Sequence, residues 1–277
     1  MTDKENYTVI LNSKNRVNKF TSTADADYLF KWDSLPEGEY KLTYSLCKQL
    51  YVTELDLLLL NKPAWGVYKA ENFDTTNQLL IDSSPNARHA SCVGCSLSNI
   101  AGFGATVGIP TVTGLASSTI LFPVGSIPPV FTMFALTRYL DVVNGRRVLS
   151  GTGENGPVGN FILGHFYDYP RVYNHSNFLT NVIDAQPKNN FCNIGFSSAS
   201  TAPNNILFNG VGIGTGNRSG LVTGRLCVNL FNPFGTGPFE TCNFGLSQVI
   251  IWDRELTTDE MRTVSSTFTK YLNTGAY

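Results

Sequence analysis

The stretch Gly245-Leu-Ser-Gln-Val-Ile-Ile-Trp-Asp-Arg-Glu-Leu-Thr-Thr-Asp-Glu-Met-Arg262 carries the strongest structural signals in the chain. Its apolar run, residues 249–252, predicts a strand that is buried on both faces. Thr257 is a good helix N-cap, and Glu260 three residues later completes a capping box. Gly275 stands where a helix would stop. Apolar residues recur between them at helical spacing: Met261, Val264, Phe268 and Leu272. The sequence therefore predicts a central strand followed by one amphipathic helix near residues 257–272.

The composition indicates an all-β protein with long loops. Hydrophobic residues make up 42% of the 277 residues and charged residues only 15%, and the chain contains 25 Gly and 13 Pro. This length is enough for a substantial core, in one large β domain or in two domains. The net charge is −1 and no basic run is present. We therefore expect no nucleic-acid partner, because the bulk electrostatic attraction that drives such binding is missing.

Neither the start of the chain nor its apolar segments predict membrane targeting. The first residues are polar and acidic, unlike a cleavable signal peptide. The most apolar stretch, residues 55–60, is far too short to span a bilayer. We therefore expect no membrane span.

The cysteines are expected to be small buried or free thiols. Cys92 and Cys95 form a C-x-x-C pair, but no second pair and no paired histidines accompany it. The six cysteines are Cys47, Cys92, Cys95, Cys192, Cys227 and Cys242. We expect no metal site and no cofactor.

Residues 1–60 show the clearest alternation of apolar and polar residues. Strands are expected at 7–12, 28–33 and 40–46, each with one apolar face, and a fourth at 52–60. The loop at 34–39 is expected to join the second and third strands as a hairpin. So few strands form a marginal core, so we expect this module to dock on another surface or another chain.

From about residue 61 the sequence pattern changes and predicts short strands between long loops rich in Gly, Ser and Thr. Such a density of strands with a single final helix predicts a two-sheet sandwich over residues 61–277. The candidate strands are 119–122, 130–139, 147–149, 161–166, 206–208, 226–230 and 248–252.

Several sequence blocks together resemble a concanavalin A-like, or laminin-G-like, jelly-roll module. The segment Asp82-Ser-Ser-Pro-Asn86-Ala-Arg88-His89-Ala90 is similar to the D-x-S-G-N-x-R-H-A turn that starts many such domains, with Pro85 where the family usually has Gly. The other blocks, in order, are Trp65-Gly-Val-Tyr68, residues 117–128, 131–139, 147–151 and 164–165, and Trp252-Asp253. As a set they resemble virion proteins of large algal and protist DNA viruses and their satellite viruses. Residues 9–16 and 35–41 resemble a leader module of those proteins.

This resemblance implies a structural virion component: a minor capsid, penton-like or surface-decorating protein, located in the virion. Its partners would be other capsid proteins or copies of itself, held through residues 1–60. The alternative is a lectin-like attachment protein that binds host glycans. Neither is an enzyme. The sequence has no alternating carboxylate motif of a glycosidase, and Glu154, Glu240 and Glu255 are isolated. We expect Glu240 to be a solvated loop acid.

The segment 165–175 is the densest in aromatic and polar groups, which makes it the best glycan-binding candidate. Aromatic faces hold the C–H surfaces of sugars, and carboxylates and amides bond their hydroxyls. The candidate residues are His165, Tyr167, Asp168, Tyr169, Tyr173 and Asn174. Two alternatives stay open: a strand pair joined by a packed Tyr-Pro turn, and a metal site of His165, Asp168 and His175, whose spacing fits no common pattern.

Two further polar sets have structural interpretations. Asp82 and Asn86 are expected to hold a turn through side-chain-to-backbone bonds, with Arg88 paired to Asp82. Arg138 follows apolar strand residues and is expected to anchor an internal ion pair.

Overall fold

The computed structural model describes residues 6–13, 16–23, 28–30, 40–42, 50–141, 145–152, 160–167, 169–174, 177–180, 189–198, 203–216, 224–231 and 240–277. Before residue 53, and at residues 173, 174 and 177, this description covers the backbone only. The chain divides into two compact units, Met1–Leu57 and Leu58–Tyr277.

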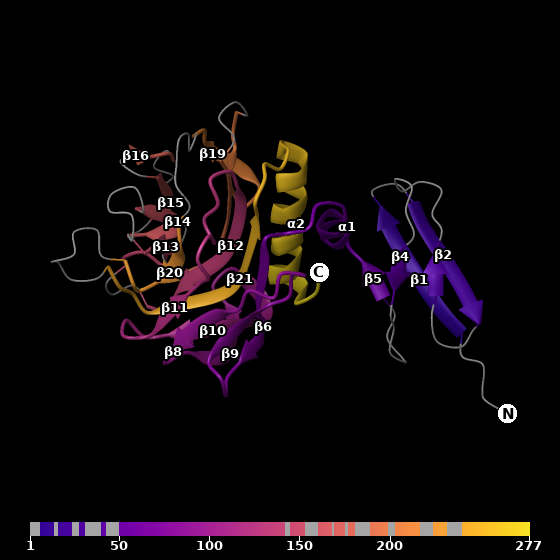
Figure 1. The fold of residues 1–277 in the computed structure, drawn as a ribbon, viewed down its shortest axis with the longest axis horizontal. Coiled ribbons are helices and arrows are strands. Elements are labelled where there is room, and N and C mark those ends of the chain that lie inside the picture. The colour runs from indigo at the N-terminus through magenta and orange to yellow at the C-terminus, as the bar shows by residue number, and fades with distance from the viewer. Residues whose placement is uncertain are drawn as a thin grey trace. The chain divides into compact units, whose positions relative to one another are not determined.

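The first unit contains a three-stranded sheet and a separate two-stranded sheet (Figure 1). Strand β1 pairs antiparallel with β2 and parallel with β5, and β3 pairs antiparallel with β4. The bounds are β1 Asn6–Ser13, β2 Arg16–Thr23, β3 Tyr28–Phe30, β4 Tyr40–Leu42 and β5 Leu50–Val52. Strands were expected at β1, β3 and β4, whereas β2 was not predicted. The predicted loop at 34–39 lies outside the described residues.

The predicted fourth strand at 52–60 is wrong: after β5 the chain forms helix α1, Glu54–Asn61. Thr53 caps this helix, because its Oγ1 accepts from the Asp56 backbone N–H at 3.1 Å, and Asp56 Oδ2 accepts from the Thr53 N–H at 2.9 Å. A short apolar run does not discriminate between strand and helix by its pattern. The leucines that fill it are strong helix formers, and the Thr-x-x-Asp cap decides the outcome.

The second unit is a β-sandwich made of antiparallel strands with one C-terminal helix. Its strands are β6 Gly66–Asp74, β7 Leu79–Asp82, β8 Ala90–Val93, β9 Ser96–Gly102, β10 Ala105–Gly114, β11 Thr119–Leu121, β12 Thr132–Tyr139, β13 Ser150–Gly151, β14 Phe161–Phe166, β15 Tyr169–Asn174, β16 Asn177–Phe178, β17 Cys192–Ser197, β18 Ile206–Phe208, β19 Val211–Gly214, β20 Leu226–Val228 and β21 Phe244–Trp252. They pair in the order β16-β15-β14-β13-β20-β11-β8-β7-β6-β21-β12-β17-β18-β19, with β10 joining β21 to β9. The predicted all-β sandwich is confirmed.

Strand β21 is the central element, as the apolar run at 249–252 predicts. It pairs with β12 on one side and with β6 on the other. All nine of its residues, Phe244–Trp252, are buried. The strand extends five residues further back than the sequence pattern indicated, because its first half is rich in small and polar residues that burial does not exclude.

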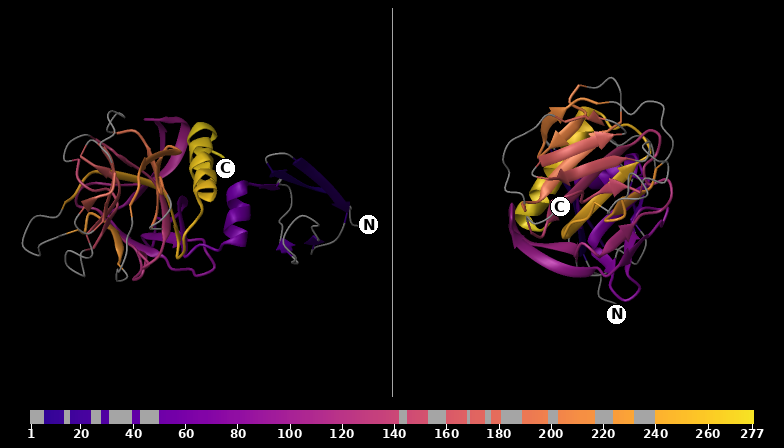
Figure 2. Two further views of the ribbon diagram at one scale, coloured as in Figure 1. Left: turned by 90° about the horizontal axis from the view of Figure 1, so that it is seen from above. Right: turned by 90° about the vertical axis from the view of Figure 1, so that its left-hand side faces the viewer.

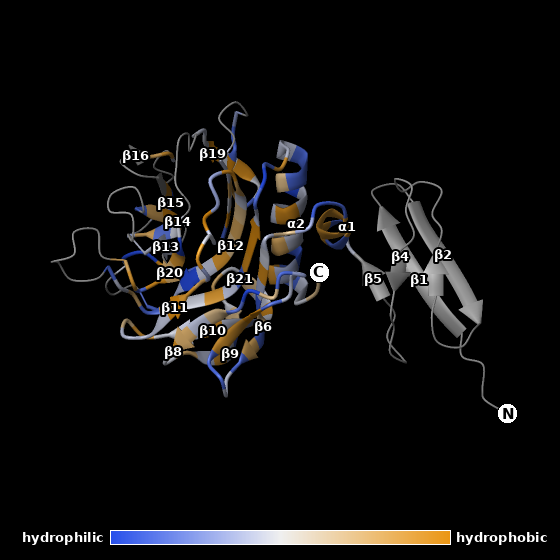
Figure 3. Ribbon diagram, viewed as in Figure 1, coloured by the Kyte–Doolittle hydropathy of each residue, from blue (hydrophilic) through white to orange (hydrophobic). Residues whose placement is uncertain are grey.

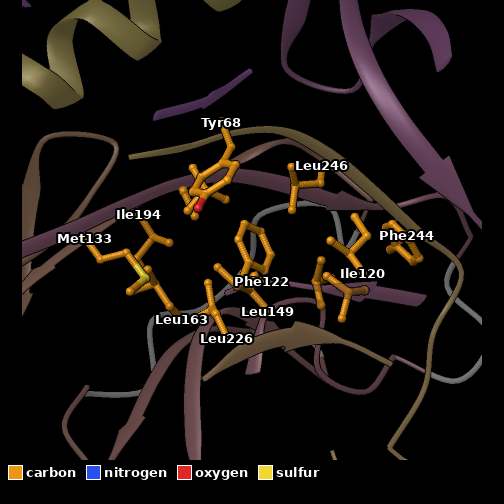
Figure 4. Close-up of a cluster of buried hydrophobic side chains, with 14 of the residues drawn as sticks. Tyr68, Ile120, Phe122, Met133, Leu149, Leu163, Ile194, Leu226, Phe244 and Leu246 are labelled. Atoms are coloured by element: carbon orange, nitrogen blue, oxygen red, sulfur yellow. The ribbon is translucent and has the colours of Figure 1, made fainter. Parts of the chain in front are cut away.

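The core lies between the two layers of the sandwich, where β14 packs across β12 and β17. Figure 4 shows labelled side chains pointing toward one another from different parts of the chain, such as Met133 of β12, Leu163 of β14 and Phe122, which follows β11. Aromatic rings meet edge to face, as in the pairs of Tyr68 with Phe122 at 4.9 Å and Phe131 with Phe196 at 5.4 Å between ring centroids. This geometry is the one that aromatic quadrupoles favour.

Helix α2, Thr258–Thr274, covers one outer face of the sandwich, over β10, β12, β17 and β18 (Figure 2). Figure 3 shows apolar and polar patches alternating along it, as expected of an amphipathic helix. Its apolar side includes Phe268, whose ring lies edge-on to Phe134 at 6.2 Å. The capping box of Thr257 and Glu260 is present, and Gly275 ends the helix at a φ of 70°. Both predicted ends are confirmed.

Replacing Thr257 by Ala should lower the free energy of unfolding by about 1 kcal/mol, because the N–H of Glu260 loses its acceptor. Urea denaturation followed by tryptophan fluorescence measures the change. Thr258→Ala is the matched control, since its side chain takes no part in the capping box. Equal effects of the two variants would contradict a stabilising role of the box.

Candidate functional site

The candidate segment forms the hairpin of β14 and β15. Phe166 pairs with Tyr169, so the hairpin turns between these two residues. Tyr167 has a φ of 54°, the left-handed conformation that short hairpin turns require. Asp168 lies outside the described residues. The strand pair of the open alternative is therefore confirmed, but its Tyr-Pro turn is wrong, because Tyr169 and Pro170 begin strand β15. The next question is which side chains of the hairpin are exposed to solvent.

His165 points into the protein and not toward solvent, so its assignment to a glycan-binding surface is wrong. The residue is 6% exposed, and its ring lies 4.7 Å from that of Tyr139. Nε2 lies 3.2 Å from the Asn190 carbonyl oxygen, and Nδ1 lies 3.4 Å from Thr137 Oγ1. A carbonyl only accepts, so Nε2 carries the hydrogen and Nδ1 is the acceptor. Both ring nitrogens are used inside the protein, which also leaves none for a metal.

Tyr167 is 46% exposed and is held by an arginine. The guanidinium carbon of Arg146 lies 4.9 Å from the centre of the Tyr167 ring, and Nη1 donates to its hydroxyl. The backbone N–H of Tyr167 donates to the Gly145 carbonyl at 2.6 Å. The Phe166 ring lies edge-on at 4.5 Å. These contacts fix one face of an exposed ring and leave the rest of it to solvent.

A second arginine joins two more rings beside this turn. The guanidinium carbon of Arg171 lies 5.1 Å from the Tyr169 ring centre and 4.8 Å from that of Phe178. Its Nη1 donates to the Thr180 carbonyl at 3.3 Å. Phe178 is 44% exposed, and its ring lies 5.7 Å from that of Phe166. The rings and guanidinium groups therefore form one surface.

We call this surface the hairpin cluster; it consists of Arg146, Phe166, Tyr167, Tyr169, Arg171 and Phe178. It offers large aromatic faces and fixed hydrogen-bond donors with positive charge. Of the sequence candidates, Tyr167 and Tyr169 belong to it. Tyr173 and Asn174 pair with Ile162 and Phe161 along the strands, and their side chains lie outside the description.

Arg146 and Phe178 are the members that the sequence did not reveal. They come from the segment before β13 and from β16, on either side of the hairpin in the chain. The pairing of Tyr173 with Phe178 and of Asn174 with Asn177 brings β16 beside β15. Two adjacent arginines, Arg146 and Arg147, are the one local feature of the sequence that points to Arg146. Their distance along the chain from the tyrosines does not connect the two groups.

Glu240 is not a solvated acid, contrary to expectation. It forms an ion pair with Arg147, which is 5% exposed and also donates to Asn160. The guanidinium carbon of Arg147 lies 3.8 Å from the Phe231 ring centre. The predicted strand at 147–149 is wrong, because β13 begins only at Ser150. Glu240 has a structural partner and is not poised as a general acid.

Asp82 holds the turn that the sequence motif indicated. Its carboxylate accepts from the backbone N–H groups of Val67, Ser84 and Arg88 at 2.8 to 2.9 Å. The predicted ion pair with the Arg88 guanidinium is wrong, since that group lies over the Trp65 ring at 4.5 Å. The Asp82 carboxylate thus holds the turn together through its hydrogen bonds to backbone N–H groups.

The cysteines that the structure describes are free and buried, as expected. Burial raises the pKa of the Cys192 and Cys242 thiols. Neither α1 nor α2 has the length and apolar composition of a membrane-spanning helix.

Comparison with solved structures confirms the fold. The fourth domain of the extracellular arabinanase AbnA of Geobacillus stearothermophilus, solved with arabinotriose, matches 74% of this chain and 98% of its own at a TM-score of 0.53 and 15% identity. The binding domain of botulinum neurotoxin serotype C1 matches 74% of this chain and 52% of its own, at 0.52 and 13%. A Trypanosoma rangeli sialidase matches 76% at 0.51 and 12%, and this chain spans 33% of its length. No protein-family model matches the sequence, and no curated protein is similar to it. At such identities the likeness establishes a shared β-sandwich.

His165 should make the stability of the protein depend on pH. Burial lowers its pKa from 6.5 to about 4. Between these values the unfolded chain binds a proton that the folded protein does not, so stability falls as the pH drops from 7 toward 4. The contribution lost between pH 7 and pH 5 is roughly 2 kcal/mol. Urea denaturation at both pH values measures it.

His165→Gln is the matched variant, because an amide keeps hydrogen-bonding capacity without titrating in this range. The pH-dependent loss should be smaller by that amount in the variant. An identical loss in wild type and variant would contradict a neutral, buried His165.

Proposed function

We propose that this chain is a non-catalytic binding protein that recognises glycans through the hairpin cluster. The observation that carries the proposal is the pair of exposed rings, Tyr167 at 46% and Phe178 at 44%, each beside an arginine. An exposed ring gives a sugar's C–H face a flat apolar surface. An arginine at its edge donates directed hydrogen bonds to ring oxygens and hydroxyls.

The contacts within the cluster favour binding because they order its side chains in advance. Arg146 is bonded to the Tyr167 hydroxyl, and Arg171 is bonded to the Thr180 carbonyl. Side chains that are already held lose less conformational entropy when a ligand arrives. The cluster stands on a strand pair, which is a more rigid base than a long loop.

Two features argue for binding without catalysis. The described part of the hairpin cluster contains no carboxylate, and Glu240 is tied to Arg147. Most glycosidases use two free carboxyl groups on either side of the bond that they cleave. Among the similar structures is a domain solved with a bound arabinotriose, which supports a sugar-binding use of this sandwich. The sialidase in the comparison is an enzyme, but this chain spans only 33% of it.

We propose further that the protein is a structural component of a virus particle, within which residues 1–60 dock on other capsid proteins or on copies of the chain. The sequence blocks described above resemble virion proteins, and Met1–Leu57 forms a separate small unit. Its β2 strand pairs only with β1 among the described strands, so one of its edges is available for another strand. A minor capsid, penton-like or surface-decorating protein that binds host glycans unites both proposals.

Tyr167→Ala and Phe178→Ala should each weaken glycan binding by about 1 kcal/mol, roughly a fivefold rise in the dissociation constant, because each removes one stacking face. The ligand is the strongest hit of a glycan array, and titration calorimetry measures its affinity. Val211→Ala on β19 is the control, since Val211 is 65% exposed but lies outside the cluster. Unchanged affinity in both cluster variants, with intact folds, would move the site elsewhere.

Mass spectrometry of purified particles from the virus that encodes the chain should detect the protein at a fixed ratio to the major capsid protein. A non-structural protein of the same virus, quantified in parallel, controls for contamination. Presence in infected cells together with absence from purified particles would exclude a virion role.

A further inference from the structure

Arg138 lies near the end of β12 with a buried charge and no acidic partner. It is 2% exposed, and it forms no ion pair with any residue in the described ranges. Its Nε donates to the Tyr139 carbonyl at 2.8 Å, whereas Nη1 is buried and has no hydrogen-bond partner. Burying a charged donor without an acceptor is costly, so this atom calls for an explanation.

The ring of Phe103 lies beside the Arg138 guanidinium, where an acidic counter-ion would be expected. Its centre lies 3.8 Å from the guanidinium carbon of Arg138, and that of Phe191 lies 5.6 Å away. Although burial lowers the pKa of Arg138 to about 10, the group stays positively charged at neutral pH. The attraction of a cation to a ring offsets part of the cost of its burial but supplies no hydrogen-bond acceptor to Nη1.

Phe103 lies at the tip of the β9–β10 hairpin, where its ring can be displaced from Arg138. It is 42% exposed, and it lies between Gly102 and Gly104, all three with φ between 55° and 86°. No heavy atom would lie within 4 Å of a Cβ added to Gly102, so this part of the tip borders open space. A half-exposed ring between two glycines moves at a small loss of buried surface.

We propose that Arg138 is a binding site for the carboxylate of an acidic sugar, which replaces the Phe103 ring over the guanidinium. A carboxylate has two acceptor atoms whose spacing matches the fork of an arginine, and it would satisfy Nη1. The displaced Phe103 and the neighbouring Phe191 supply apolar surface for the carbons of the sugar ring.

Among the described residues, no carboxylate forms an ion pair with Arg138 that a bound carboxylate would have to displace. Burial, and after it the charge of Arg138, lowers the pKa of His165, so this neighbour is neutral at pH 7 and adds no charge of its own to the site. The site adjoins the hairpin through residues 190 and 191: the Asn190 carbonyl faces His165, and the Phe191 N–H donates to the Phe103 carbonyl at 2.8 Å. The carboxylate site at Arg138 is inferred from the contacts of this arginine. That the carboxylate belongs to a sugar rests on the proposed function.

The test is a melting-temperature titration of the full chain with sodium glucuronate, with glucose and sodium chloride at matched concentration and ionic strength as controls. Glucuronate should raise the melting temperature by about 3–5 °C at about ten times its dissociation constant, and above that constant the rise should follow the logarithm of its concentration. The two controls should not. An equal rise with chloride would overturn the site, and sodium acetate as effective as glucuronate would overturn the assignment to a sugar.

Two variants give opposite results if the site exists. Arg138→Met should abolish the glucuronate effect without lowering the melting temperature of the free protein, because an apolar side chain replaces an unpaired buried charge. Phe103→Ala should bind glucuronate more tightly than wild type, since no ring has to be displaced. Should the methionine variant not fold, Arg138→Lys replaces it, with binding weakened at least about tenfold by loss of the two-pronged contact.

A purely structural Arg138 predicts the reverse: no response to glucuronate in wild type or in Phe103→Ala, and destabilisation of Arg138→Met. None of these measurements involves Tyr167 or Phe178. Failure of the glycan site at the hairpin cluster and failure of the carboxylate site at Arg138 are therefore seen separately.

Discussion

The sandwich depends on one constraint, the burial of β21 on both of its faces. Because β12 pairs with one edge and β6 and β10 share the other, its backbone groups are satisfied without water. Its inward residues enter the core between the layers, and the outer face of its layer is covered by α2, which follows the strand directly and packs over β10, β12, β17 and β18. The capping box at Thr257 starts that helix five residues beyond Trp252. The order strand, turn, helix is thus a consequence of burying one strand completely.

The features predicted from the sequence are those that nearby residues determine. The strand at 249–252 and the helix of Thr257 to Gly275 follow from an apolar run and two caps, each complete within a few residues. The error at 52–60 has the same origin, because the leucine run fits both structures and the Thr53–Asp56 cap was not weighed. Strands β7 and β8 were not predicted because each has only four residues, too few for an alternating pattern to stand out, although β7 pairs with its neighbours in the chain, β6 and β8.

The same limit applies to the candidate site. The density of aromatic and polar residues in segment 165–175 indicated the hairpin. In the structure, His165 points into the protein from β14, whereas the next residue, Phe166, is partly exposed. Taken as one loop, segment 165–175 groups residues whose side chains a strand directs to opposite faces. Arg146 and Phe178 reach the hairpin cluster through turns and pairings outside the segment. Arg138 shows the opposite case, where an expected carboxylate partner is replaced by the aromatic ring of Phe103.

The buried cysteines have a consequence for the protein's chemistry. The five that the structure describes, from Cys92 to Cys242, are at most 5% exposed, and none is paired. A thiol reacts as the thiolate. Burial limits access to all five sulfurs and raises the pKa of Cys192 and Cys242, whereas a hydrogen bond with Cys92 lowers the pKa of Cys95. Alkylating reagents and oxidants therefore reach these sulfurs only when the sandwich opens. The speed of their modification then reports the opening of the fold, so the cysteines serve as intrinsic reporters of how long the native state persists.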